Sequence, residues 1–201
     1  MNIWFKRILY SLLLLLVLAV AINFQYFYTN VKYAFLRRAG ALDERFQKVV
    51  AGEKETMEPN YLLIPSLGIQ APIIYISENS DQAFSKALQN GVVHYPGAAL
   101  PGELGNSYIF GHSSDYPWKA GNHKTVFALL SRIKIGAVVQ ISDATGEVFT
   151  YTVTTAFVAG AGEIQYLNPD AGQKRILTLQ TSWPLGTALK RWIVIAELTS
   201  P

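Results

Sequence analysis

The feature that most constrains the fold is a series of short apolar segments, separated by turn residues, that begins after Asn60. Short segments bounded by Gly, Pro, Asn and Asp are typical of β-strands. In one of them, Phe149, Tyr151 and Val153 alternate with threonines, as in a half-buried antiparallel strand. The pattern predicts strands near 61–65, 67–76, 92–95, 107–111, 137–142, 147–157, 175–181 and 191–198.

Two segments between these strands have helical patterns instead. Asn79-Ser80-Asp81 offers capping side chains for a helix over 81–90, and the apolar residues of 124–133 recur at helical spacing. Strands do not alternate with long helices, which argues against a parallel α/β sheet. We therefore expect a mainly-β fold, a closed or nearly closed eight-stranded barrel with two short helices.

A different pattern precedes the strands. Residues 8–31 carry no formal charge, and a helix of this length can cross a hydrocarbon core of about 30 Å. Aromatic residues at both ends, at 4–5 and 26–28, suit the two membrane interfaces. Ala19-Val-Ala21 also fits a signal-peptidase site, but the apolar character continues past it, which favours an uncleaved anchor.

The chain is therefore expected to have four parts. These are an N-terminus at 1–7, a transmembrane anchor at 8–31, an amphipathic helix with a polar linker at 32–59, and one domain at 60–201. The amphipathic helix would serve as a stalk or lie on the membrane or on the domain. Basic residues flank the anchor on both sides, so charge alone does not give its orientation.

Composition excludes several classes of function. The net charge of +3 comes from scattered Lys and Arg, with no basic tract or motif that would indicate nucleic-acid binding. The chain has no cysteine, which excludes disulfides, thiolate metal sites and a thiol nucleophile. The three histidines lack metal-ligand spacing, so we expect no metal and no other cofactor, although Glu163 and Asp170 leave a weak calcium contact open.

Three residues at predicted strand ends have the chemistry of an acyl-transfer site. Ser182 is followed by Trp183-Pro184, which ends its strand; His112 follows Gly111 at the end of another strand; and Arg191 opens the last strand. A hydroxyl, an imidazole and a guanidinium can act as nucleophile, acid or base, and oxyanion stabiliser. Taken singly, each also has an ordinary explanation as a turn serine, a loop histidine or a solvated cation.

Together these motifs resemble the sortases, which are membrane-anchored cysteine transpeptidases of the bacterial cell envelope. The resemblance rests on Gly111-His-Ser-Ser114, on Thr178-Leu-Gln-Thr-Ser-Trp-Pro-Leu-Gly-Thr187 with Arg191 after it, and on the segment 94–106. It covers residues 60–198. It implies a sortase barrel outside the cell with the N-terminus inside, His112 as acid or base, and Arg191 as substrate or oxyanion stabiliser.

The resemblance also implies partners. These are the lipid bilayer, an extended sorting-signal peptide of the Leu-Pro-x-Thr-Gly type in a secreted protein, and an amine acceptor from a cell-wall peptide or a pilin lysine. Thr181, Trp183 and Trp118 are candidates for the wall of the peptide groove, although both tryptophans fit ordinary rim packing equally well.

One position departs from the family pattern, because Ser182 stands where sortases have the nucleophilic cysteine. A serine hydroxyl is a weaker acid than a thiol and needs a neutral base, normally oriented by a third group. Asp115 is near His112 in sequence, but spacing alone does not show that it orients the ring, and no Gly-x-Ser-x-Gly elbow surrounds Ser182. Three hypotheses stay open: a sortase of impaired activity, a serine-nucleophile hydrolase of the same peptides, and a non-catalytic peptide-binding or scaffolding module.

Overall fold

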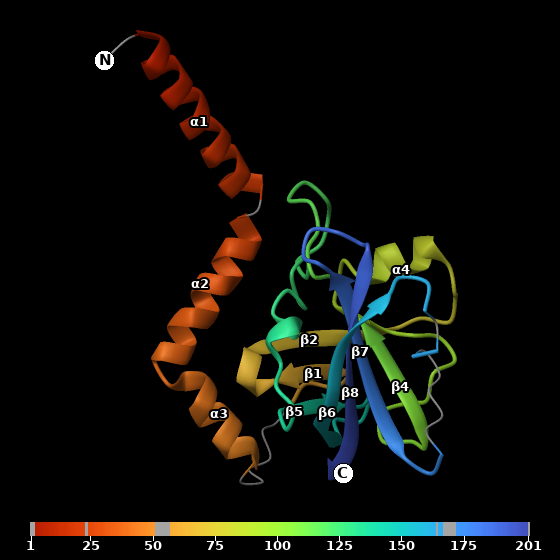
Figure 1. Cartoon of the computed structure of the whole chain (residues 1–201). Coiled ribbons are helices and arrows are strands. Elements are labelled where there is room, and N and C mark those ends of the chain that lie inside the picture. Colours follow the sequence, from red (N-terminus) through yellow and green to blue (C-terminus); the bar gives the residue numbers. More distant parts are fainter. Residues whose placement is uncertain (1–2, 23, 51–56, 164, 167–171, 201) are drawn as a thin grey trace.

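The protein is a β-barrel with a long helical arm at its N-terminus (Figure 1). The computed structural model describes residues 3–22, 24–50, 57–163, 165–166 and 172–200. The strands of the barrel are β1 (Tyr61–Ile64), β2 (Ile69–Tyr75), β3 (Val92–His94), β4 (Gly105–Phe110), β5 (Val138–Ser142), β6 (Val148–Gly160), β7 (Arg175–Trp183) and β8 (Lys190–Ser200). Each one overlaps a segment that the sequence pattern predicts as a strand, and the mainly-β prediction is confirmed.

The strands close into a barrel in the order β1-β2-β3-β4-β7-β8-β6-β5. Most neighbours are antiparallel, but β2 pairs with β3, and β4 with β7, in parallel. A parallel pair needs a long connection, and the chain between β4 and β7 includes β5 and β6. The carboxyl ends of β4 and β7 therefore lie at the same end of the barrel.

The core of the barrel consists of aliphatic and aromatic side chains that alternate along the strands. Residues such as Ile109, Leu177, Leu179 and Val194 have no exposed surface. Each fully buried side chain of this size stabilises the fold by about 1.5–3 kcal/mol relative to an exposed one. The strand frame therefore depends on apolar burial.

The two short helices expected between the strands differ in outcome. The first is α4 (Asp81–Ala87), and its N-cap Ser80 accepts a hydrogen bond from the backbone N–H of Ala83 at 3.2 Å. The second segment, 124–133, forms a succession of turns that ends in the short 3₁₀ helix η2 (Leu130–Arg132), so the expected continuous helix is not formed. The backbone N–H of Phe127 donates to the carbonyl of His112 at 2.9 Å rather than to a carbonyl four residues earlier, and the Phe127 ring is fully buried in the barrel core.

The N-terminal arm contains three helices, α1 (Ile3–Ile22), α2 (Phe24–Arg38) and α3 (Ala41–Val50). Among the described residues, α1 is the one helix long and apolar enough to cross a membrane, with a mean hydropathy of 2.2. The continuous amphipathic pattern of 31–49 is split between α2 and α3. The break lies at Gly40, whose φ of 73° is the left-handed conformation that commonly ends a helix. In the polar linker expected at 51–59, residues 51–56 lie outside the described part of the chain.

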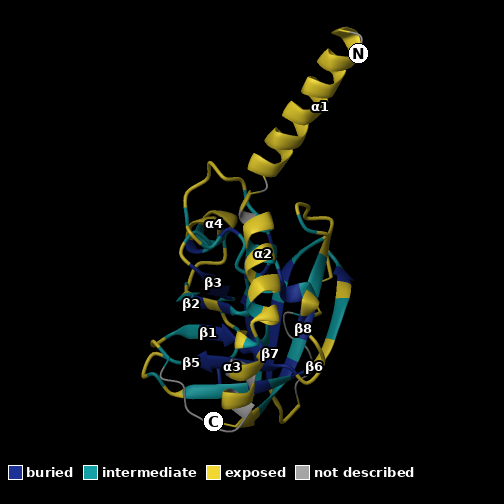
Figure 2. Ribbon diagram, turned by 90° about the vertical axis from the view of Figure 1, so that its left-hand side faces the viewer, coloured by how far each residue is buried: buried dark blue, intermediate teal, exposed yellow. Residues whose placement is uncertain are grey.

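Helices α2 and α3 pack along one side of the barrel, whereas α1 extends away from it (Figure 2). Arg132 donates a hydrogen bond to the Asn30 side chain at 2.6 Å, and its guanidinium lies 5.2 Å from the Tyr33 ring centroid. On α3, Leu42 is buried and its side chain lies over Gly68, at the end of the 3₁₀ helix η1 (Pro65–Leu67). The arm is therefore attached to the barrel by polar contacts at α2 and by an apolar contact at α3.

Candidate active site

The register of the parallel pair β4–β7 brings two of the candidate residues to one rim of the barrel. Phe110, the last residue of β4, pairs with Gln180. The backbone N–H of Gly111 continues the ladder by donating to the Gln180 carbonyl at 3.1 Å. Two residues beyond the pair on each strand are His112 and Ser182. The structure therefore places both at the same end of neighbouring strands.

Arg191 lies directly across from Ser182. In the antiparallel pair β7–β8, Ser182 and Arg191 are register partners. Directly opposed residues of an antiparallel pair have Cβ atoms about 4.5–5.5 Å apart. The guanidinium is held by two hydrogen bonds of 3.0 Å, which it donates to the carbonyls of Ala188 and Lys190. The three predicted site residues thus share one rim of the barrel.

The turn that carries His112 is fixed by close packing. A Cβ at Gly111 would lie 2.8 Å from a carbon of the Phe127 ring and 3.0 Å from the Val92 side chain, so only glycine fits without displacement. The buried Thr181 hydroxyl donates to the Gly111 carbonyl at 2.8 Å. The backbone N–H of Phe127 donates to the carbonyl of His112 at 2.9 Å. His112 is therefore positioned through its backbone from both sides.

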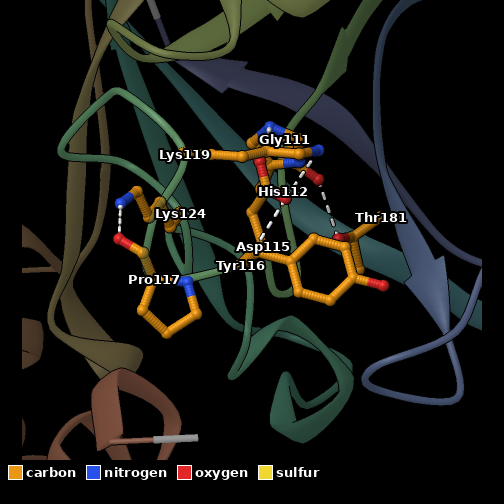
Figure 3. A network of polar contacts seen from close by, with 8 residues as sticks. All are labelled: Gly111, His112, Asp115, Tyr116, Pro117, Lys119, Lys124 and Thr181. Atoms are coloured by element: carbon orange, nitrogen blue, oxygen red, sulfur yellow. Dashed lines mark hydrogen bonds and ion pairs between the residues drawn. The ribbon is translucent and has the colours of Figure 1, made fainter. Parts of the chain in front are cut away.

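The imidazole of His112 shares a small charged cluster with Asp115 and Lys119 (Figure 3). Its Nε2 lies 3.7 Å from an Asp115 carboxylate oxygen, which is longer than a hydrogen bond. The other oxygen of Asp115 accepts from Lys119 Nζ at 2.9 Å and from the backbone N–H of Tyr116 at 2.8 Å. Asp115 thus acts on His112 through charge, while its hydrogen bonds go elsewhere.

The electrostatics of the cluster favour a neutral imidazole. Burial lowers the pKa of His112 from its ordinary value of 6.5; the Asp115 carboxylate opposes this shift, and the Lys119 ammonium adds to it. For Asp115, burial favours the protonated form, but hydrogen bonds from Lys119 and Tyr116 and the nearby imidazole outweigh it and lower the pKa. A neutral His112 beside an ionised Asp115 is the expected state at neutral pH.

A cavity of about 420 Å³ lies next to Ser182. Its wall includes Thr181 and Trp183 of β7, together with residues of α2 and of the 113–132 segment: Tyr26, Asn30, Ser113, Phe127, Ala128, Ser131 and Arg132. Pro184 and Leu185 complete it. His112 and Arg191 are not among its described lining residues. The cavity therefore approaches Ser182 from the side of the helical arm.

The two tryptophan candidates have different surroundings. Trp183 lines the cavity, and its ring packs on Trp192 with centroids 5.4 Å apart. Trp118 is not among the described lining residues of the cavity; it lies on the loop after His112, stacked on Tyr116 at 4.8 Å and 71% exposed. Trp183 is thus adjacent to Ser182, and Trp118 projects into solvent.

The remaining histidines and acidic residues do not assemble a metal site in the described part of the chain. His94 is buried, with its Nε2 2.9 Å from the Ala99 carbonyl, and His123 lies beside α2 at the edge of another cavity. Glu163 accepts a hydrogen bond from the backbone N–H of Gly160 at 2.9 Å. Asp170 lies outside the described residues.

The sequence reasoning missed two features of the site. The first is the ion pair between Lys119 and Asp115, which the spacing of four residues between them could have indicated. The second feature is the contribution of α2, because Tyr26 and Asn30 line the cavity beside Ser182. No local signal connects α2 to position 182, since the contact depends on how the arm packs on the barrel.

Comparison with known proteins identifies the family. A model of the sortase domain matches residues 62–199. This chain belongs to the sortase family. The match covers all of β2 to β7 and most of β1 and β8, so it includes the rim with Ser182, His112 and Arg191.

Solved sortases share the fold. Sortase C1 from Streptococcus agalactiae is 25% identical, with a TM-score of 0.59 over 71% of this chain and 67% of that one. Sortase C-1 from Actinomyces oris is also 25% identical, with a TM-score of 0.59 over 77% and 82%. A lid mutant of sortase A from Corynebacterium diphtheriae is 25% identical, with a TM-score of 0.58 over 78% and 77%. No curated protein matches the chain.

Proposed function

We propose that this protein is a membrane-anchored sortase that binds a sorting-signal peptide and that Ser182 limits its acyl-transfer step. The observation that carries the proposal is the shared rim, where Ser182 pairs with Arg191 across β7–β8 and His112 lies two residues beyond the end of the adjoining β4. Family membership supports a transpeptidase role on proteins that carry sorting signals.

The roles follow from the chemistry of each group. The residue at position 182 would attack the peptide carbonyl, and His112 would take up its proton and later return a proton to the leaving amine. Arg191 would stabilise the developing oxyanion or hold a substrate carbonyl. An amine acceptor, either a cell-wall peptide or a pilin lysine, would then resolve the acyl intermediate.

Serine changes the first step. A thiol can ionise near neutral pH, but a hydroxyl must lose its proton to a base during the attack. No third group orients His112 among the described residues, since Asp115 is 3.7 Å from Nε2 and is bonded to Lys119. We therefore expect turnover by the chain with Ser182 to be weak, because the base that a serine requires is only loosely positioned.

The decisive experiment replaces Ser182 by cysteine in the full chain, reconstituted in lipid. The donors are extended peptides of the Leu-Pro-x-Thr-Gly type, and hydroxylamine serves as a general amine acceptor. We expect Ser182→Cys to raise the rate of hydroxamate formation by about 100-fold or more over the chain with Ser182. The matched control is Ser182→Cys with His112→Ala, which keeps the thiol and removes the base.

Absence of hydroxamate and of any donor binding by Ser182→Cys would overturn the proposal. Binding without turnover would instead favour the non-catalytic peptide-binding or scaffolding hypothesis. The two results are separated by measuring peptide affinity alongside the rate.

A serine-nucleophile hydrolase is a second candidate, and the lowered pKa of His112 favours it. Burial keeps this imidazole neutral near pH 7, which is the form that can remove a hydroxyl proton. Attack by Ser182 on the peptide carbonyl would form an ester intermediate, and water would then hydrolyse this ester. A phosphonate peptide that labels the chain with Ser182 but not Ser182→Ala would support this candidate, and absence of labelling would exclude it.

For the location of the chain, we propose a single-pass anchor with the N-terminus inside and the domain outside the cell membrane. The proposed parts are 1–7, the anchor over 8–31, a juxtamembrane segment over 32–59 and the domain from 60 to 201. The apolar helix α1 supports the anchor. Protease added to intact spheroplasts should remove the domain and leave a small protected fragment. Full protection would show the opposite orientation.

A further inference from the structure

We infer that the rim of the barrel that carries Ser182 lies against the membrane surface and that the loop over 113–119 inserts its aromatic residues into the lipid interface. The inference rests on the proposed membrane anchor, with the hydrocarbon span taken to end with α1 at Ile22 and residues 23–31 of the proposed anchor taken to lie in the interfacial region. Its partner is the phospholipid bilayer that α1 spans.

The first observation is the height of the rim along the arm. Tyr26 and Asn30 of α2 line the same cavity as Ser182 and Leu185. These α2 residues follow the last residue of α1, Ile22, by four and eight positions. At 1.5 Å per residue, they lie about 3 and 9 Å along α2 from its first residue, Phe24. The rim is therefore within reach of the lipid headgroups.

The second observation is the direction of the loop after His112. The chain that follows the loop reaches Thr125, whose hydroxyl is hydrogen-bonded to the hydroxyl of Thr29 in α2 at 3.4 Å. From there the loop rises beside the arm to the level of the lower end of α1 in both views (Figures 1 and 2). The loop is thus the part of the barrel nearest to the proposed membrane boundary.

The third observation is the chemistry of the loop. Trp118 is 71% exposed and Tyr116 is 55% exposed, and their rings stack at 4.8 Å. Exposed apolar rings are costly in water, but Trp and Tyr concentrate at membrane interfaces, where one edge of the ring is apolar and the other hydrated. Lys119 lies 5.6 Å from the Tyr116 centroid, but its charge is paired with Asp115 at 2.9 Å, so the proposed contact with lipid depends on the aromatic rings.

The loop is held firmly enough to present this surface. The buried Lys124 side chain donates to the Pro117 carbonyl at 2.8 Å and ties the tip of the loop to its base (Figure 3). Ser114 Oγ accepts from the backbone N–H of Gly186 at 3.2 Å, which joins the loop to the β7–β8 connection. That connection adds Leu189, 73% exposed, to the same rim.

Aromatic residues at the start of α2 extend this surface toward α1. Phe24 is 60% exposed and Tyr28 is 58% exposed. With Tyr116, Trp118 and Leu189, they form a discontinuous apolar belt at one end of the molecule. A belt at this level would fix the tilt of the barrel relative to the bilayer. The Ser182 cavity would then face secreted substrate proteins as they leave the membrane.

Because the chain has no cysteine, a single introduced cysteine can carry a unique spin label. The full chain is reconstituted in vesicles of phosphatidylcholine and phosphatidylglycerol, with labels at Ala120→Cys and Leu189→Cys on the rim. Relaxation by oxygen and by a water-soluble nickel chelate then gives the depth of each label. Two reference labels are Leu15→Cys in α1 and Ala144→Cys in the β5–β6 turn. That turn lies at the opposite end of the barrel, because β6 starts where β8 ends.

We expect both rim labels to sit at interfacial depth, Leu15→Cys in the hydrocarbon and Ala144→Cys in water. Adding Tyr116→Ser and Trp118→Ser should reduce the oxygen-to-nickel ratio at position 120 at least threefold. The matched control is Leu104→Ser, which removes an exposed apolar side chain just before β4, at the far end. Circular dichroism confirms that each variant is folded.

The inference would be overturned if the rim labels were as accessible to the nickel chelate as the label at Ala144→Cys. A label at Leu15→Cys that lies in hydrocarbon in the same experiment would show that the proposed anchor still holds. An aqueous label at position 15 would overturn both. A rim label that becomes shielded only after the donor peptide is added would also overturn the inference, since Trp118 would then be a wall of the peptide groove.

Discussion

The interior of the barrel and its Ser182 rim are built from the same strands but differ in what holds them. Inside, Ile109 and Leu177 are fully buried among aliphatic neighbours. Beyond the ends of the same strands, His112 keeps a quarter of its side chain exposed and is positioned by backbone and charged contacts. The interior therefore supplies most of the stability, whereas the candidate site lies at the rim. Substitutions at position 182 should perturb the fold less than substitutions in the interior.

The largest expected effect on stability comes from the interior. Leu177→Ala should lower the free energy of unfolding by about 2–5 kcal/mol, because it removes a buried side chain and leaves a cavity. Urea denaturation measures the change. The matched rim substitution, Ser182→Ala, should cost less than about 1 kcal/mol, because Ser182 is partly exposed. Equal losses for the two variants would break the comparison.

A residue at the boundary should affect both properties. Thr181→Val keeps the shape of a buried side chain but leaves the Gly111 carbonyl without its hydroxyl donor. An unsatisfied buried polar group costs about 1–3 kcal/mol. In the Ser182→Cys background we also expect a lower kcat, since this bond fixes the turn before His112. Denaturation and hydroxamate assays measure the two effects. Loss of stability with an unchanged kcat would assign Thr181 to the interior alone.

The pH dependence of stability should distinguish two histidines. Burial lowers the pKa of both His94 and His112 below 6.5, so the unfolded chain binds protons first as pH falls. Stability is therefore complete above about pH 6.5 and is lost as pH falls toward the folded-state values. Because His94 is 4% exposed, His94→Gln should reduce this acid loss more than His112→Gln. Thermal unfolding between pH 7 and 5 tests the order, and the reverse order would contradict it.

The smallest expected effects are shifts in the titration of His112 itself. Asp115→Asn removes the carboxylate that raises the pKa of His112, so the pKa should fall further. Lys119→Met removes a positive charge that lowers it, so the pKa should rise. NMR titration of the imidazole measures both. His94 is the internal control, and its pKa should not move. Shifts in the same direction for the two variants would rule out a simple charge effect.

Local sequence patterns were enough to predict which segments become strands and which family the chain belongs to. Alternating apolar residues need no tertiary information to mark one buried face, and the sortase motifs flank Ser182, His112 and Arg191 at fixed positions along the chain. The apolar composition of α1 is likewise a local property. The ion pair between Lys119 and Asp115 could also be predicted, because the two residues are four positions apart.

How these segments meet depends on long-range packing, which no local pattern in the sequence encodes. The parallel register of β4 and β7 brings His112 to the level of Ser182 across 70 residues of sequence, as the pairing of Phe110 with Gln180 shows. The helical spacing over 124–133 does not give a continuous helix, because the backbone N–H of Phe127 donates to the His112 carbonyl at 2.9 Å, a long-range bond that only the tertiary structure supplies. The contact of α2 with the Ser182 cavity has the same origin, since long-range packing depends on which surfaces remain uncovered once the barrel has closed.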